Sequence, residues 1–175
     1  VKIGVKGDYA NDAGNIQEAI GIYTMLIIDG EICSGLNDSQ KYPRQTIGIT
    51  ADGKVVIMSA DGAQAPTSIG LTMLEQAQVM QDLGCVWAGH LDGGGSMTYG
   101  SRPEGSDTFK IVNSPSDGSE RSISNGFIIV STEAQSKAFS KVKFEVENEY
   151  IAPGASIAVE ATGVSQSGSA ADIPA

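Results

Sequence analysis

The sequence predicts an α+β fold: a curved mixed β-sheet with one principal helix over about residues 72–84, followed by the first strands of a β-sandwich-like segment. Three observations support this prediction. Short apolar, β-branched runs are bounded by Asp-Gly turns, which is typical of strands joined in hairpins. A single segment combines a capping signal with apolar residues at helical spacing. Residues 141–146 alternate strictly between polar and apolar side chains, as in a half-exposed strand.

Composition already excludes several classes of protein. The chain has 175 residues, of which 41% are hydrophobic and 18% charged, and this balance is typical of a folded domain. With 11 Lys and Arg against 21 Asp and Glu, the net charge of −10 argues against a nucleic-acid partner. No apolar run approaches the roughly 18 residues of a membrane span. We therefore expect neither nucleic-acid binding nor membrane insertion.

The first strands are predicted from runs that end in turns. Tyr23–Asp29 leads into Asp29-Gly30, and the runs Thr46–Thr50 and Lys54–Ser59 flank Asp52-Gly53. Because Asp-Gly favours tight hairpin turns, the strands on either side of Asp52-Gly53 should pair with each other. A buried strand is predicted over 85–91, and another apolar strand over 126–130 after a long surface loop at 101–125.

Sequence signals predict both ends of the helix. Thr72 and Glu75 form a capping-box pattern, in which each side chain bonds an amide that the helix leaves open. Gly84 is suited to the left-handed backbone that follows many helices. Apolar residues on one face predict packing against the sheet: Met73, Leu74, Ala77, Met80 and Leu83.

The composition changes near residue 131. We expect a main domain over 1–131, a polar linker over 132–140 and a partial module over 141–175, in which 155–161 is a second strand. These alternating strands resemble the opening of a bacterial immunoglobulin-like module. The chain begins in an apparent strand, so an excised fragment is expected, with another segment or chain completing the fold. Cys33 and Cys85 allow one disulfide, and the sequence leaves their pairing open.

The turn Asp92-Gly93-Gly94-Gly95-Ser96 is the strongest candidate site. It follows the predicted buried strand, and three consecutive glycines allow a backbone shape that no side chain would permit. Successive amides of this kind can form a concave nest for an anion such as phosphate. The alternative is a tight turn with no ligand.

These residues resemble a known family. Gly89–Ser96 is similar to the N-L-D-G-G-G-S segment of the phosphodiester glycosidase family, with His90 in place of the usual Asn. Further similar segments follow in the same order: Gly7–Tyr9 (N-G-D-F/Y), Glu18–Gly21 (E-P-I-G), Pro43–Gly48 (R-T-A-I-G), Asp52–Gly62 (D-G-x-V…A-D-G) and Arg121–Gly126 (R-x-x-S-N-G). The resemblance covers about residues 5–130 and implies hydrolysis of sugar-1-phosphodiesters, such as those of N-acetylglucosamine, at the C1–O bond.

The resemblance also implies roles for individual residues. Arg44 is the expected phosphate clamp, because a guanidinium binds phosphate oxygens in pairs. Asp92 and Glu18 are the expected catalytic carboxylates, since glycoside hydrolysis usually uses two. His90 is a further catalytic candidate, or else a buried structural residue. The expected substrate-binding residues are Asp8, Asp61, Gly93, Gly94, Gly95, Ser96 and Asn125, although Asp61, Asp92 and Asn125 also suit turn roles and Glu18 a solvated loop.

No resident cofactor is expected, and a Ca²⁺ site is the minority alternative. Asp8, Asp61 and Asp92 are oxygen ligands of the type that Ca²⁺ takes, but nothing resembles an EF-hand loop. The trailing β module predicts a secreted or wall-associated bacterial protein acting on phosphodiester-linked glycans. Two competing interpretations are a domain that binds such glycans without cleaving them and a structural surface domain.

Overall fold

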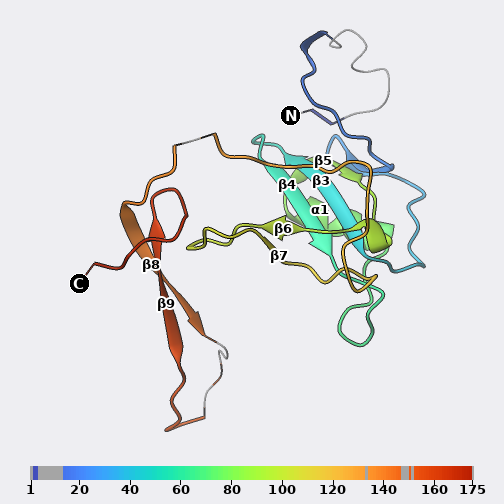
Figure 1. Cartoon of the computed structure of the whole chain (residues 1–175). Helices are drawn as coiled ribbons and strands as arrows, with labels where there is room; N and C mark the ends of the chain where they lie inside the picture. The colour runs from blue at the N-terminus through green and yellow to red at the C-terminus, as the bar shows by residue number, and fades with distance from the viewer. Residues whose placement is uncertain (1, 4–13, 133, 147–149, 151, 175) are drawn as a thin grey trace. The chain divides into compact units, whose positions relative to one another are not determined.

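A computed structural model describes residues 2–3, 14–132, 134–146, 150 and 152–174 (Figure 1). The chain divides into two compact units. The first comprises Val1–Tyr99 and Asn113–Phe127, and the second comprises Gly100–Val112 and Ile128–Ala175. The second unit therefore combines a short segment from the middle of the chain with the C-terminal residues.

The first unit is built on a five-stranded antiparallel sheet. Its strands are β1 (Thr24–Ile28), β2 (Glu31–Ile32), β3 (Arg44–Thr50), β4 (Val55–Ala60) and β5 (Cys85–His90), in the order β2-β1-β5-β3-β4. This confirms the predicted class of a β-sheet with one principal helix. Every strand pairing is antiparallel, whereas a mixed sheet was expected. The difference arises because hairpin turns join β1 to β2 and β3 to β4, and β5 then runs antiparallel to both β1 and β3.

The β3–β4 hairpin forms around Asp52-Gly53 as predicted. Ile49 pairs with Val55 and Ile47 with Ile57, so the register follows directly from the turn. Gly53 has a φ of 84°, in the left-handed region that favours glycine, and its amide donates to the carbonyl of Thr50 at 2.9 Å. The turn therefore fixes the register of the hairpin, in which Arg44, the first residue of β3, pairs with Ala60, the last residue of β4.

Helix α1 (Met73–Asp82) begins and ends where the sequence indicates. Thr72 is the N-cap, and its hydroxyl accepts from the Glu75 amide while the Glu75 carboxylate accepts from the Thr72 amide. Gly84 follows the helix with a φ of 80°. One predicted core position is wrong, since Leu83 is 51% exposed, and a polar residue, Gln76, is fully buried instead.

The core lies between α1 and the sheet (Figure 1). Buried apolar side chains from both layers make it up: Leu26, Ile27, Ala77, Met80, Cys85 and Ala88. Gly48 of β3 lets the layers approach, because a Cβ there would lie 2.6 Å from Cε of Met80 and 2.8 Å from Sγ of Cys85. Cys33 and Cys85 are free thiols. Among the described residues, no helix is long and apolar enough to cross a membrane.

The second unit contains two small hairpins. One joins β6 (Gly100–Ser101) to β7 (Lys110–Ile111), and the other joins β8 (Phe139–Val146) to β9 (Val159–Ser165). The predicted strand at 141–146 is confirmed, whereas the second strand lies at Val159–Ser165 instead of 155–161. The immunoglobulin-like interpretation of this hairpin stays a prediction.

Two further predictions, one of a loop and one of a strand, are corrected. The segment 101–125 contains the β6–β7 hairpin rather than being irregular throughout. Residues 126–130 do not form a strand, and their apolar side chains are exposed, with Ile128 at 81%. A strand needs a partner for its backbone groups, and within the described chain this segment pairs with none.

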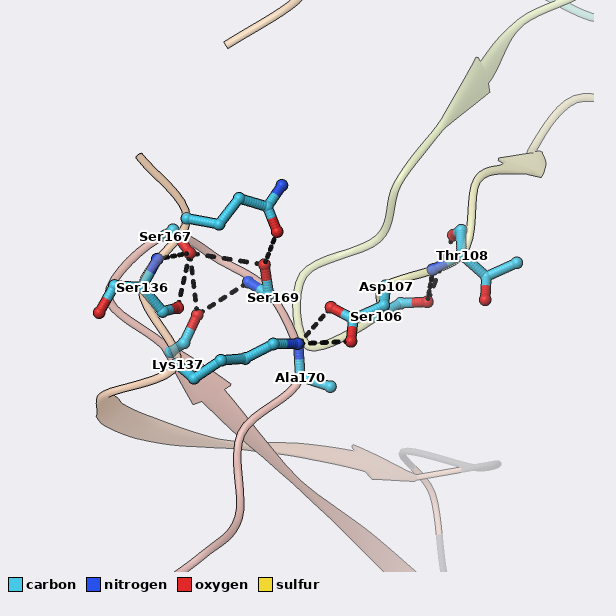
Figure 2. A network of polar contacts seen from close by, with 10 residues as sticks. Ser106, Asp107, Thr108, Ser136, Lys137, Ser167, Ser169 and Ala170 are labelled. Atoms are coloured by element: carbon cyan, nitrogen blue, oxygen red, sulfur yellow. Dashed lines mark hydrogen bonds and ion pairs between the residues drawn. The ribbon is translucent and has the colours of Figure 1, made fainter. Parts of the chain in front are cut away.

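Polar contacts tie the two hairpins of the second unit together (Figure 2). Nζ of Lys137 lies 2.6 Å from Oδ2 of Asp107, and the amide of Ala170 donates to the other carboxylate oxygen at 3.3 Å. The amide of Ser136 donates to Oγ of Ser167 at 3.1 Å, and that hydroxyl donates to the Ser136 carbonyl at 2.8 Å. Residues 136 and 137, expected to lie in a linker, are therefore bonded to both hairpins.

The capping box should carry measurable stability. Replacing Thr72 by Ala removes the acceptor for the Glu75 amide at a buried helix end, which should lower the free energy of unfolding by about 1 kcal/mol. Chemical denaturation followed by circular dichroism measures this. The matched control is Thr67→Ala in an exposed loop, which should leave the free energy unchanged. Equal stability of the two variants would contradict the assigned N-cap.

Candidate functional site

A pocket of about 420 Å³ opens where β3 begins and β5 ends. The antiparallel register sets Thr46 opposite His90, so the first residue of β3, Arg44, and the last residue of β5, His90, come to the same edge of the sheet. The lining residues come from the β1, β3, β5 and α1 regions: Tyr23, Asn37, Gln40, Tyr42, Pro43, Arg44, Met73, His90, Leu91, Asp92, Gly93 and Gly94.

Arg44 is a buried cation held by backbone carbonyls. It is 7% exposed, its Nε donates to the Leu71 carbonyl at 3.0 Å, and its Nη2 donates to the Gln40 carbonyl at 3.2 Å. The guanidinium carbon lies 5.5 Å from the centre of the Tyr42 ring. Burial lowers the pKa of the guanidinium from its ordinary high value, yet an arginine stays protonated in proteins. Among the described residues, no carboxylate forms an ion pair with Arg44.

His90 lies directly against Arg44. It is 4% exposed, and its Nε2 lies 3.5 Å from Nη1 of Arg44. Its Nδ1 lies 3.2 Å from the carbonyl oxygen of Gln45, and the Tyr23 ring meets the imidazole edge-on at 6.0 Å. Burial and then the charge of Arg44 lower the pKa of His90, while the Gln45 carbonyl and the charge of Asp92 act in the opposite direction. The net effect favours a neutral imidazole.

Gln76 is a site residue that the sequence analysis missed. It is fully buried on α1, and its Nε2 donates to the Gln45 carbonyl at 3.2 Å and to Oγ1 of Thr46. The same nitrogen lies 3.2 Å from Nδ1 of His90. One signal was present in the sequence: Gln76 lies between Met73 and Met80 on the face that packs against the sheet. A polar side chain on such a face needs a buried partner.

The glycine turn packs tightly against the start of β3. A Cβ on Gly93 would lie 2.6 Å from the Pro43 carbonyl oxygen, and Gly94 has a φ of 59°. The Gly93 amide donates to Oδ1 of Asp92 at 2.9 Å, and the Gly94 amide donates to the Pro43 carbonyl at 3.1 Å. The Ser96 amide donates to the Gly93 carbonyl at 3.3 Å. These three amides already have acceptors, so a nest of free amides at 93–96 receives no support from this geometry.

An ion pair lies against Gly95 and Ser96, the last two residues of the turn. Arg121 contacts Asp117 through Nη2 at 2.7 Å and Nε at 2.8 Å, and its Nη1 reaches Oγ of Ser96 at 3.5 Å. A side chain on Gly95 would collide with both residues. Ser96 and Gly95 therefore contact this ion pair, and neither lines the pocket.

The other predicted site residues lie apart from the pocket lining. Glu18 and Asn125 are exposed, and neither lines the pocket. Asp61 accepts from the Asn113 amide group at 3.2 Å and from the Ser114 amide at 3.0 Å, so it ties down a loop. Asp8 lies outside the described residues. Within the described residues, no three His, Cys, Asp or Glu side chains gather as a metal site would require.

Two aromatic rings at the pocket were also missed. Tyr23 is largely exposed just before β1, and Tyr42 is exposed just before β3. Each is an isolated aromatic residue in its own segment of the sequence, so neither belongs to a pattern that predicts binding. The pocket is therefore lined by the buried cation of Arg44, the solvent-exposed carboxylate of Asp92 and the exposed rings of Tyr23 and Tyr42.

The fold is mainly β with one helix, and a buried arginine lines its open pocket. The comparison with protein families is more specific. The chain belongs to the phosphodiester glycosidase family, whose model matches residues 2–130.

Two related proteins have been compared with the chain. It is 40% identical over 83 residues to the SPbeta prophage-derived uncharacterized protein YomE of Bacillus subtilis (strain 168), covering 47% of this chain and 12% of that protein. A solved structure of a hypothetical protein from Synechocystis is 28% identical, with a TM-score of 0.35, and the match covers 42% of this chain and 15% of that chain. The chain therefore spans only a small part of each of these proteins.

Replacing His90 should change how stability depends on pH. Because the pKa of His90 is lowered in the folded protein, the unfolded chain binds a proton more readily below the ordinary value of 6.5. Stability from this group is fully present above pH 6.5 and falls as the pH drops below it, by at most about 1.4 kcal/mol per pH unit. The His90→Asn variant should lose this part of the dependence.

Urea denaturation of the wild type and His90→Asn between pH 4.5 and 8 measures the effect. The carboxylates titrate in both proteins, so the difference between the two curves isolates His90, the single histidine of the chain. A constant difference across the whole range would show that the folded protein does not disfavour the charged imidazole.

Proposed function

We propose that this protein hydrolyses the C1–O bond between a sugar and phosphate in glycan phosphodiesters. Membership of the phosphodiester glycosidase family supports the reaction class. In the reaction, water adds to C1 as the bond from C1 to the phosphate oxygen breaks. The products are the free sugar, which carries a hydroxyl group on C1, and a phosphate monoester. The proton that water loses passes to a base or to solvent.

The observation that carries the proposal is Arg44, a buried cation without an ion-pair partner in the described chain. A buried charge is normally paired, and here the open side faces the pocket. A guanidinium has five N–H groups, and three are directed at Leu71, Gln40 and His90. One N–H on each terminal nitrogen is left, which suits two oxygens of one phosphodiester.

Asp92 is the proposed catalytic carboxylate. It is the one carboxylate among the described residues that line the pocket, and it follows β5 directly. The departing phosphate monoester is weakly basic, so it needs little protonation as it leaves. A single carboxylate then has the role of stabilising positive charge at C1 or accepting the proton of the attacking water. The exposed rings of Tyr23 and Tyr42 offer apolar faces for the sugar.

The same observation favours a second candidate. Glycosidases usually use two carboxylates, and Glu18 does not line the pocket. A domain that binds phosphodiester-linked glycans through Arg44 without cleaving them would need no second carboxylate. We propose wall or capsular polymers as the ligands in either case, and a secreted or wall-associated location follows from that proposal.

Replacing Asp92 by Asn tests the catalytic assignment. Hydrolysis of the methyl phosphodiester of N-acetylglucosamine 1-phosphate should fall at least about 100-fold, because the carboxylate acts in the transition state. Affinity for the substrate should change little. The rate is measured by the release of reducing sugar, and the affinity by calorimetry. The control Asp82→Asn, an exposed carboxylate at the end of α1, should retain full activity.

Replacing Arg44 by Gln should weaken substrate binding more than about tenfold, since a charge-assisted contact to phosphate is lost. Substrate binding without turnover across a panel of sugar-1-phosphodiesters would favour the binding domain. Full activity in both Asp92→Asn and Arg44→Gln would contradict the site itself.

A further inference from the structure

Three donors converge beneath the pocket on one backbone oxygen. The Gln45 carbonyl is approached by the Leu91 amide at 2.9 Å, Nε2 of Gln76 at 3.2 Å and Nδ1 of His90 at 3.2 Å. The two side-chain nitrogens also lie 3.2 Å from each other, as two donors to a shared acceptor do. The geometry is consistent with a proton on Nδ1 of His90 that points to Gln45.

The other side of the imidazole leads to the same assignment. A guanidinium has no acceptor, so Nη1 of Arg44 can only donate. Nε2 of His90, at 3.5 Å, must therefore present its lone pair to Arg44 in a long hydrogen bond. A proton on Nε2 would place two donors against each other, and a proton on both nitrogens would also place two positive charges against each other. The charged groups around the ring are Arg44 from β3 and Asp92 after β5, with Tyr23 at its edge.

Gln76 has an incomplete set of partners, which argues against a purely stabilising role. Its Oε1 is buried and accepts no hydrogen bond. An open buried acceptor costs stability, so packing alone does not account for an amide at this position. The loss of Gln76 would leave the Gln45 oxygen with two other donors, but it would take away the donor to Oγ1 of Thr46. What Gln76 adds is a restraint on the carbonyl and on the imidazole that contacts Arg44.

We propose that Gln76 and His90 are positioning residues that hold the Arg44 guanidinium in place for an anionic ligand, with His90 a neutral hydrogen-bond acceptor and not a proton donor to substrate. This inference rests on the proposed function only in taking Arg44 as the group that binds the phosphodiester. It gives α1 a part in the site, since Gln76 links the helix to the sheet edge. His90 acts from beneath Arg44 through Nε2.

The proton position can be observed directly because His90 is the single histidine of the chain. Long-range ¹H–¹⁵N NMR of the wild type should show a protonated Nδ1 and an unprotonated Nε2 at neutral pH. A pH titration should give a pKa below the ordinary histidine range, and Arg44→Gln should raise it. A protonated Nε2 at neutral pH, or a pKa that does not respond to Arg44→Gln, would overturn the assignment.

The positioning role is tested by binding of inorganic phosphate, measured by calorimetry at pH 7.5. Gln76→Leu should weaken phosphate affinity about tenfold, and its free energy of unfolding should fall because the buried Oγ1 of Thr46 loses its donor, so the affinity is measured where circular dichroism shows the variant to be folded. The matched control is Gln81→Leu, since Gln81 also lies on α1 and donates to a carbonyl, that of Gly30 at 2.9 Å, but it is exposed and its acceptor lies in the β1–β2 turn instead of beside His90. Phosphate affinity equal to the wild type in Gln76→Leu would overturn the proposal.

A second pair of variants keeps the test decisive if Gln76→Leu does not fold. His90→Phe removes the acceptor and should weaken phosphate binding about tenfold, whereas His90→Asn, which retains an acceptor oxygen, should recover part of that loss. Equal affinity of all three proteins would overturn the positioning role. Substrate hydrolysis that is unaffected by these variants would contradict the positioning role alone, whereas a wild type that binds neither phosphate nor substrate would overturn the proposed function as well.

Discussion

The burial of Arg44 with no carboxylate partner among the described residues is the constraint on which the site depends. Removing a guanidinium from water is costly, and the fold offsets that cost with the carbonyls of Leu71 and Gln40 and with the neutral ring of His90. These partners come from different parts of the chain, so the pocket forms only when β3, β5 and the segment before α1 are all in place. Under the proposed function, stability and ligand binding would be coupled through this one side chain.

The sheet and helix follow from local sequence signals. Asp52-Gly53 sets the register of β3 and β4, and Thr72 with Glu75 starts α1, because turns and caps depend on residues close in the chain. The strand expected at 126–130 was wrong for the converse reason. Its apolar residues suit a strand, but strand formation depends on a partner that no local pattern specifies.

The site was only partly predictable. Arg44, His90 and Asp92 were found through motifs. Tyr23 and Tyr42 line the pocket, and Gln76 lies against His90, because of register and helix packing, which single residues do not reveal. The glycine turn was predicted to cradle an anion with free amides. Instead, glycine at 93 is required by the closeness of the Pro43 carbonyl, and the Gly93 and Gly94 amides have acceptors within the protein. Backbone amides that look available in a sequence can be used by neighbouring strands.

The hairpin formed by β6 and β7 has a consequence for how the chain is divided. The family match ends at residue 130, yet Asp107 in that hairpin bonds Lys137 and Ala170, which lie beyond the match. The end of the family match and the end of the hydrogen-bonded unit therefore fall at different places in the chain. A fragment that ends at residue 131 would keep all the residues of the family match. It would, however, expose the carboxylate of Asp107 in the β6–β7 hairpin, which Lys137 and Ala170 contact in the full chain.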